Sequence, residues 1–260
     1  MKRVVVISDL HCGHCVGLTP PGWQYHASAA NIERRKYAKM QAGVWKFYAE
    51  TIDHLQPIDI LIVNGDLVDG KGERSGGTEQ LEPSFIKQAE MAAECLRYAQ
   101  AKHIVITYGT PYHAGADEDF EGIVAKNVGA SIGSHEFVNV DGLIFDIKHH
   151  IGGSTIPHGR FTAVARDYLW NELWAARNGQ PRAQILIRSH VHYCIWCGTP
   201  DALMIVTPGL QGYGSKYGTR RCSGTVDIGL ISFDVENKEE WSWQKYLFEA
   251  EYLKVKILKF

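Results

Sequence analysis

The chain has 260 residues, a formal net charge of −2 and a hydrophobic content of 45%, enough apolar material for one large α/β domain, predicted over 1–260. The near-neutral charge gives no overall attraction to nucleic acid, and six cysteines are too few for a disulfide scaffold. No apolar run approaches the roughly 20 residues that span a bilayer and no signal peptide is recognisable, so we predict a cytoplasmic protein with no membrane association.

The first predicted strand is a β-branched run from Val4 to Ile7, and it is followed by Asp9 and His11. Side chains two residues apart on an extended backbone point to the same side, so these two can bind one cation together. An acid with an imidazole suits Mn, Fe or Zn. The alternative interpretation is a surface turn after a core strand, because an Asp-x-His triplet is common by chance.

Prolines and glycines between residues 16 and 23 predict a loop over the end of this strand. Trp23 and Tyr25 in this region either line a substrate opening or only anchor the loop. Helical periodicity follows from about Ser28 to Leu55. Its expected buried side chains are Ile32, Ala38, Val44, Phe47, Tyr48 and Ile52.

The second predicted strand, residues 59–64, also ends at a glycine and an acid, Gly65 and Asp66. Asp66 stands where a carboxylate could bridge two cations. Asp69 could orient Asp66 or only cap the turn, and we favour the structural role. A helix from about Pro83 to Ala101 leads into a third strand, 103–108, which ends before Gly109-Thr110-Pro111-Tyr112-His113. In doubly wound sheets, ligands bind beyond such carboxyl ends.

Further strand ends carry histidines. A short helix from Asp117 precedes a predicted hairpin over 136–146, turned by Asp141-Gly142, and its second strand leads to His149 and His150. After a helix over 162–178, a fourth apolar strand, 184–188, ends at His190 and His192. Later segments expected to be extended are 202–206 and 225–234, with a hairpin turn at 236–237.

Six acids and histidines thus follow predicted strands, namely Asp9, His11, Asp66, His149, His190 and His192. The order of the motifs, Asp-x-His, Gly-Asp-x-x-Asp, Gly-x-x-x-His, His and then His-x-His, resembles the calcineurin-like metallophosphoesterase superfamily over roughly residues 3–193. A narrower resemblance, to phosphoesterases of phages and prophages, rests on softer features such as the segment 17–21.

The resemblance implies an α/β sandwich of two mixed β-sheets flanked by helices, with a dinuclear centre of Mn, Fe or Zn. It implies hydrolysis of a phosphate mono- or diester by a metal-activated hydroxide, with His113 protonating the leaving oxygen or stabilising its charge. The implied first metal is held by Asp9, His11 and His192, the second by His149 and His190, and Asp66 bridges the two.

The third motif departs from the family, which usually has Gly-Asn-His followed by an acid, with the asparagine as a ligand of the second metal. This chain lacks the asparagine, so either Thr110 or a water replaces it, or His113 is itself the ligand and not the acid. Between the paired histidines, the family's pattern favours His149 as the ligand and leaves His150 a lesser role as a neighbouring contact.

Two Cys-x-x-Cys pairs follow the first and last ligand pairs, and together they could hold an additional structural zinc on Cys12, Cys15, Cys194 and Cys197. The separation of the pairs is far outside the usual zinc-ribbon spacing, and the alternative is four small, semi-buried side chains. A thiol-redox protein built on these pairs is a third class of function, after the enzyme and a non-catalytic metal-binding protein that kept the fold.

A loop rich in glycine and tyrosine, residues 207–221, could bring Lys216, Arg220 or Arg221 to substrate phosphates. Tyrosines between these basic residues would allow base stacking, so a nuclease or nucleotide phosphodiesterase acting on nucleotides or nucleic acid is the alternative enzyme. The sequence predicts neither the substrate nor the oligomeric state.

Overall fold

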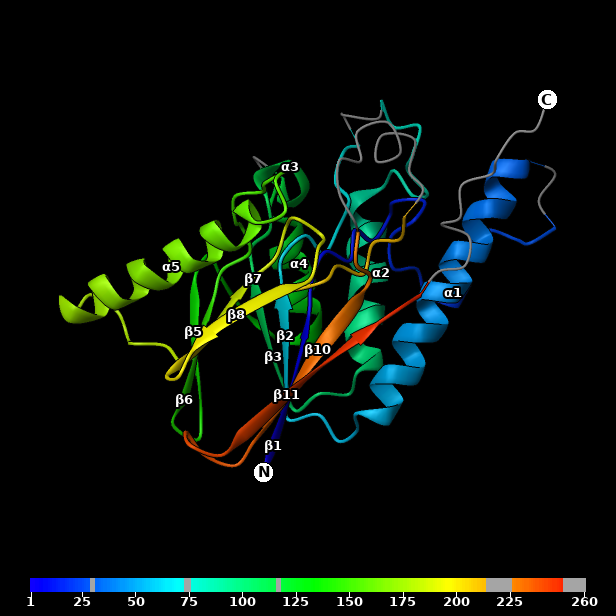
Figure 1. Ribbon diagram of the computed structural model, residues 1–260. Coiled ribbons are helices and arrows are strands. Elements are labelled where there is room, and N and C mark those ends of the chain that lie inside the picture. The colour runs from blue at the N-terminus through cyan, green and yellow to red at the C-terminus, as the bar shows by residue number, and fades with distance from the viewer. Residues whose placement is uncertain (29–30, 73–75, 116–117, 214–225, 250–260) are drawn as a thin grey trace.

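The computed structural model describes residues 1–28, 31–72, 76–115, 118–213 and 226–249, which form two β-sheets with helices outside them (Figure 1). The six-stranded sheet contains, in spatial order, β11 (Trp241–Leu247), β10 (Gly229–Val235), β1 (Lys2–Ile7), β2 (Ile60–Asn64), β3 (His103–Thr107) and β4 (Ser131–Gly133). The five-stranded sheet contains β5 (Glu136–Val140), β6 (Leu143–Ile147), β7 (Ile185–Arg188), β9 (Ala202–Val206) and β8 (Ile195–Thr199). The helices are η1 (Pro21–Trp23), α1 (Ile32–His54), α2 (Phe85–Tyr98), α3 (Pro111–Ala114), α4 (Phe120–Val128) and α5 (Gly159–Ala176).

Both sheets are mixed. In the first, β1, β2, β3 and β4 pair in parallel, and β10 and β11 are added antiparallel at the β1 edge. In the second, β6, β7 and β9 are parallel, and the two outer strands are antiparallel. This arrangement confirms the predicted sandwich of two mixed sheets flanked by helices.

Alternate residues of β1 serve two different hydrophobic cores, which explains why its sequence is apolar at every position. Val5 and Ile7 pack with residues of α1, α2 and α4 on one side of the sheet. Val4 and Val6 pack between the two sheets. A third core lies under α5, where Val164 meets residues of β7 and β9. The layers are therefore helices, sheet, sheet and helix.

Most of the helices and strands predicted from the sequence are present, although their first and last residues differ from the predicted ones. The hairpin at Asp141-Gly142 is formed by β5 and β6. In α1, the prediction of a buried Ile32 was wrong, since its side chain is 75% exposed in the first turn of the helix. The indole Nε1 of Trp23 donates to Glu94 at 2.9 Å, and Trp23 and Tyr25 pack against the first core, so both anchor the loop.

No residue range was predicted for β8 or for β11, although the hairpin turn expected at 236–237 implied a strand at the place of β11. Each is an edge strand and carries exposed positions throughout its length, so neither has the apolar run that predicts a buried strand. None of the described helices combines the length and the apolar character needed to cross a bilayer.

A buried ionic group connects α5 to the second sheet. The carboxylate of Asp146 on β6 lies 2.8 Å from the Arg188 guanidinium and 2.8 Å from Nε2 of His135. The amide of Asn171 on α5 donates to the same carboxylate at 3.1 Å. Burial opposes ionisation, but the hydrogen bond from His135 and the charge of Arg188 lower the pKa of Asp146 to about 2.

We expect Asp146 to stabilise the fold above its unfolded-state pKa and to lose that contribution as the pH falls toward 2. A drop in pKa from 3.8 to about 2 corresponds to about 2.5 kcal/mol, of which about 1.5 kcal/mol is lost between pH 5 and pH 2.5. Urea unfolding of the wild type and Asp146→Asn should therefore show a stability difference that shrinks by about that amount over this range. Asp141→Asn, which removes an exposed partner of Lys2, is the control and should show almost no pH-dependent difference. If both variants differed from the wild type by the same free energy of unfolding at every pH, the low pKa assigned to Asp146 would be contradicted.

Candidate functional site

The six predicted ligands lie just beyond the carboxyl ends of β1, β2, β6 and β7, where the two sheets meet. Asp9 and His11 follow β1, Asp66 follows β2, and His149 follows β6. His190 and His192 follow β7. Two groups of three side chains result, and each could hold a metal ion.

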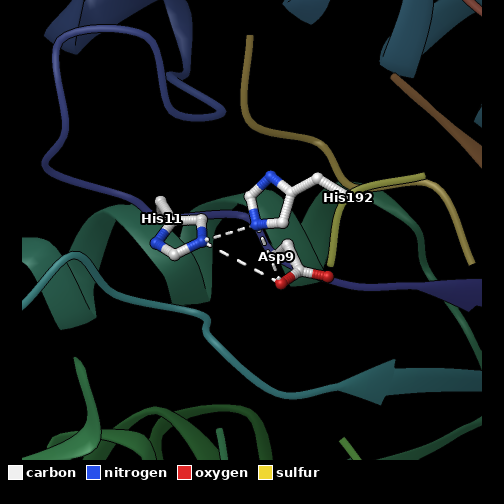
Figure 2. A group of neighbouring side chains, drawn as sticks. All are labelled: Asp9, His11 and His192. Atoms are coloured by element: carbon white, nitrogen blue, oxygen red, sulfur yellow. Dashed lines mark hydrogen bonds and ion pairs between the residues drawn. The ribbon is translucent and has the colours of Figure 1, made fainter. Parts of the chain in front are cut away.

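The first cluster consists of Asp9, His11 and His192, whose side chains point toward one another (Figure 2). Oδ1 of Asp9 lies 3.1 Å from Nε2 of His192 and 4.0 Å from Nε2 of His11. The two histidine Nε2 atoms are 3.3 Å apart. Donor atoms of residues as far apart in sequence as His11 and His192, 181 positions, thus converge on one point.

The second cluster consists of Asp66, His149 and His190. Oδ2 of Asp66 lies 3.1 Å from Nε2 of His149 and 3.9 Å from Nδ1 of His190. The same oxygen is 4.0 Å from Nε2 of His11 in the first cluster. Asp66 therefore stands between the two clusters.

Several donor atoms of these clusters are buried without a hydrogen bond to any described residue. They are Oδ1 of Asp9 in the first cluster and Nε2 of His149 and Nδ1 of His190 in the second, and Nδ1 of His11, which faces Asp69, is also without one. Buried polar atoms are normally hydrogen-bonded, so a group of such atoms needs a ligand. Carboxylate oxygens and imidazole nitrogens suit a borderline divalent cation, and the donors present fit one ion in each cluster.

One histidine tautomer is set by the backbone. Nδ1 of His149 donates to the carbonyl oxygen of Asn64 at 2.6 Å, which leaves Nε2 directed at Asp66. Metal-binding histidines commonly use one nitrogen in this way to orient the other. His150, in contrast, is exposed, and its ring lies 4.9 Å from the ring of His190.

The backbone around the site has an uncommon conformation. Five of the six predicted ligands have positive φ angles, namely Asp9 at 51°, His11 at 44°, Asp66 at 52°, His190 at 74° and His192 at 53°. Only three other non-glycine residues among those described have positive φ. Left-handed backbone is unfavourable for L-residues and concentrates at functional sites. This local geometry turns the side chains inward immediately after each strand.

Electrostatics pair each buried carboxylate with an imidazole. Burial would raise the pKa of Asp9, but His192 lowers it to about 2. For Asp66, His149 likewise outweighs burial and holds the pKa of the carboxyl well below its usual range. Burial opposes the protonation of His149, but Asp66 raises its pKa to about 10. The carboxylates are thus ionised, as metal ligands must be.

His113 lies beside the first cluster and is absent from the second. Its ring contacts the ring of His11 edge-on, with centroids 4.5 Å apart. Its Nδ1 lies 2.7 Å from the carbonyl oxygen of Asp69, to which it donates. The carboxylate of Asp69 is 4.0 Å from Nδ1 of His11, and His11, Asp69 and His113 form a third group that could hold a cation. Asp69, expected to be structural, is therefore part of the site.

Thr110 follows Gly109, at the position where the family usually has asparagine. Its backbone N–H donates to Oδ1 of Asp66 at 2.7 Å, and its hydroxyl donates to the same oxygen at 3.2 Å. A Cβ on Gly109 would overlap the Asp66 carboxylate, so only glycine permits this approach. Thr110 thereby holds Oδ1 of Asp66 in place, while Oδ2 is the oxygen that lies nearest His149 and His190.

Sequence reasoning missed the residues that hold these loops. The buried carboxylate of Glu121 on α4 accepts the backbone N–H groups of Leu67 at 2.9 Å and Gly109 at 2.7 Å, and so clamps the Asp66 loop to the Thr110 loop. Burial raises the pKa of Glu121 to about 7. No motif marks this residue, because its partners are backbone atoms.

A second missed feature is a chain of buried side-chain hydrogen bonds beneath the clusters. The hydroxyl of Thr107 donates to Asn64, the Asn64 amide donates to Ser189 at 2.7 Å, and Ser189 contacts Thr207 at 2.7 Å. Thr207 contacts Ser8 at 2.8 Å. These residues follow or end strands of both sheets, so the chain fixes the sheets to each other at the site.

The predicted zinc on four cysteines is not supported. No cysteine joins a metal-competent group among the described residues. Sγ of Cys12 lies 3.9 Å from Sγ of Cys95, and Cys12 and Cys15 belong to the core under α1 and α2. Cys197 packs instead against the core under α5. Members of the two pairs therefore belong to different hydrophobic cores. The basic residues Lys216, Arg220 and Arg221 lie outside the described residues.

We expect Gly65→Ala to weaken metal binding at the second cluster. Gly65 has φ +76°, and a Cβ there would lie 2.5 Å from the His149 ring, which must then move. Displacing a ligand in this way should weaken affinity by about 10–100-fold, measured by calorimetric titration with Mn²⁺. Gly129→Ala is the matched control, since Gly129 has φ +68° with nothing within 4 Å. Unchanged metal affinity in Gly65→Ala, or an equal loss in both variants, would refute this role of the second cluster.

Comparisons with known proteins agree with this architecture. The family model described as calcineurin-like phosphoesterase matches residues 2–211. A Vps29 single mutant from Entamoeba histolytica superposes with a TM-score of 0.50 and 15% identity, over 95% of this chain and 92% of that one. A novel archaeal phosphodiesterase gives a TM-score of 0.49 and 15% identity, over 94% and 100%. No curated protein matched in a sequence comparison. The structural similarity to Vps29 shows the fold, and the family match extends over most of the sequence, so the chain belongs to the calcineurin-like phosphoesterase family.

Proposed function

We propose that the protein hydrolyses phosphate mono- or diesters at a dinuclear metal centre formed by the two clusters. The observation that carries this proposal is the pair of adjacent buried donor groups with Asp66 between them. Asp9, His11 and His192 would hold the first ion, His149 and His190 the second, and Asp66 both. Family membership supports a hydrolase acting on phosphoester bonds.

Two divalent ions, of Mn, Fe or Zn, would supply a water of lowered pKa and would polarise the phosphoryl group. The protein's own residues do the positioning. Asn64 orients His149, Thr110 holds one oxygen of Asp66, and Glu121 keeps their loops together. The second ion would then have three protein ligands and no asparagine. A catalytic metal site commonly keeps such an open position for water or substrate.

We assign His113 to the leaving group and not to the second metal. Its ring contacts His11, and it is absent from the group of Asp66, His149 and His190, which supports a role at the leaving group over one as a substitute for the missing asparagine. Its Nδ1 donates to the Asp69 carbonyl oxygen, which leaves Nε2 to carry a proton to a substrate oxygen. Burial lowers the pKa of His113, and the charge of Asp66 and the hydrogen bond to the Asp69 carbonyl oppose this effect.

We expect His113→Ala to keep two metal ions per chain and to lose turnover. Removing a general acid should lower kcat on aryl phosphate mono- and diesters by about 10²–10⁴-fold. Metal content would be measured by elemental analysis after chelator treatment and Mn²⁺ reconstitution. His103→Ala is the control, because His103 is exposed at the opposite end of β3.

Two other outcomes would change the assignment. Loss of one metal in His113→Ala would make His113 a ligand. A wild-type protein with full metal loading and no turnover on any phosphoester would favour a non-catalytic metal-binding protein. A nuclease or nucleotide phosphodiesterase stays the alternative enzyme. The likeness to phage-type phosphoesterases, the cytoplasmic location and the single domain over 1–260 stay predictions.

A further inference from the structure

Helix α5 carries an exposed apolar face. Eleven large hydrophobic side chains are exposed among the described residues, and six of them belong to this helix and the turn before it. The six are Ile156, Phe161, Leu169, Trp170, Leu173 and Trp174, and we call them the α5 face. Single exposed apolar residues are ordinary, whereas a contiguous group marks an interaction surface.

The periodicity of the helix makes this group continuous. Phe161, Leu169 and Leu173 are spaced by multiples of four, and Trp170 and Trp174 form the next row. The stripe from 161 to 174 is about 20 Å long. The opposite side of the helix is already used, since Val164 and Asn171 are buried. Figure 1 shows α5 at the periphery, with its Ala176 end directed away from the sheets.

The surroundings of the α5 face are basic. The exposed residues between 155 and 182 include Arg166, Arg177 and Arg182 but no carboxylate. Asp167 is turned inward to Arg188 at 2.7 Å, and Glu172 pairs with Arg182 at 3.2 Å. Within the described part of the chain, Arg166 and Arg177 have no ion pair. This is a local excess of positive charge on a chain whose formal net charge is −2.

We propose that the α5 face docks the folded protein on the surface of an anionic lipid bilayer. Tryptophan, phenylalanine and leucine partition into the interfacial region, and nearby arginines bind acidic headgroups. The helix would lie in the plane of the interface and would not cross the bilayer. The expected lack of membrane association rested on the absence of spanning segments, which a surface helix does not need.

Charge and shape favour a bilayer over other occupants. A second copy of the chain would bring this local excess of positive charge against its own like, because a twofold interface uses the same patch on both subunits. The apolar side chains protrude from one convex helix, and a bilayer interface adapts to protruding rings. An anionic bilayer therefore complements both the charge and the shape of the α5 face.

Vesicle flotation of the full-length protein tests this proposal. We expect binding to phosphatidylcholine vesicles containing about a quarter phosphatidylglycerol to be at least tenfold tighter than binding to phosphatidylcholine alone. Trp170→Ser/Trp174→Ser should weaken binding by about tenfold or more, since both indoles insert. Trp196→Ser is the matched control, because Trp196 is 42% exposed on β8, and it should bind as the wild type does.

The charge component has its own variants. Arg166→Ala and Arg177→Ala should each weaken binding to anionic vesicles about fivefold, and raised salt should do the same to the wild type. Lys46→Ala, at a side chain 73% exposed on α1, should change nothing. Equal thermal stability of all variants would show that the fold is intact.

Three results would overturn the proposal. They are no flotation of the wild type with either vesicle, unchanged flotation of Trp170→Ser/Trp174→Ser, and a wild-type dimer in solution that this double variant abolishes. The last result would make the α5 face an interface between copies of the chain.

Discussion

The site depends on how two buried carboxylates are neutralised. Asp9 and Asp66 are 0% and 1% exposed, and an unpaired buried charge costs several kcal/mol. Each lies 3.1 Å from an imidazole nitrogen, so His192 and His149 balance them when they carry protons. A divalent cation in each cluster would do the same with greater charge. The groups that would bind metal are therefore also those that make the buried acids tolerable.

Bringing these side chains together requires a strained backbone conformation. Five predicted ligands have left-handed φ angles, each unfavourable by about 1 kcal/mol or more. The buried chain from Thr107 through Asn64, Ser189 and Thr207 to Ser8 offsets it by fixing the strand ends of both sheets. Glu121 adds two hydrogen bonds to the loops themselves. The result is a preorganised set of donors on rigid elements.

Much of the fold could be predicted because its central strands are buried on both faces. The apolar runs of β1, β2, β3 and β7 are unmistakable, and acids or histidines placed directly after such runs must gather at one edge. The edge strands β8 and β11 lack this signal, since half their residues face water. The exposure of Ile32 also escaped prediction, because helical periodicity continues into a first turn that projects beyond the core.

The geometry of the site was less predictable. The sequence indicated which histidines would meet, but not that Thr110 would cap Asp66 with two hydrogen bonds or that His113 would lie beside His11. Those contacts depend on loop conformation. The role of Glu121 was hidden because a carboxylate that binds backbone amides leaves no pattern in sequence. The cysteine pairs gave the opposite error, because their regular spacing suggested a cluster, whereas Cys12 and Cys15 pack in one hydrophobic core and Cys197 packs against another.

Anomalous X-ray scattering from crystals grown with Mn²⁺ tests the dinuclear centre most directly. The account predicts two peaks about 3.5–4 Å apart, one within each cluster and both within bonding distance of the Asp66 carboxylate. A single peak at Asp9, His11 and His192, with none beside His149 and His190, would contradict it.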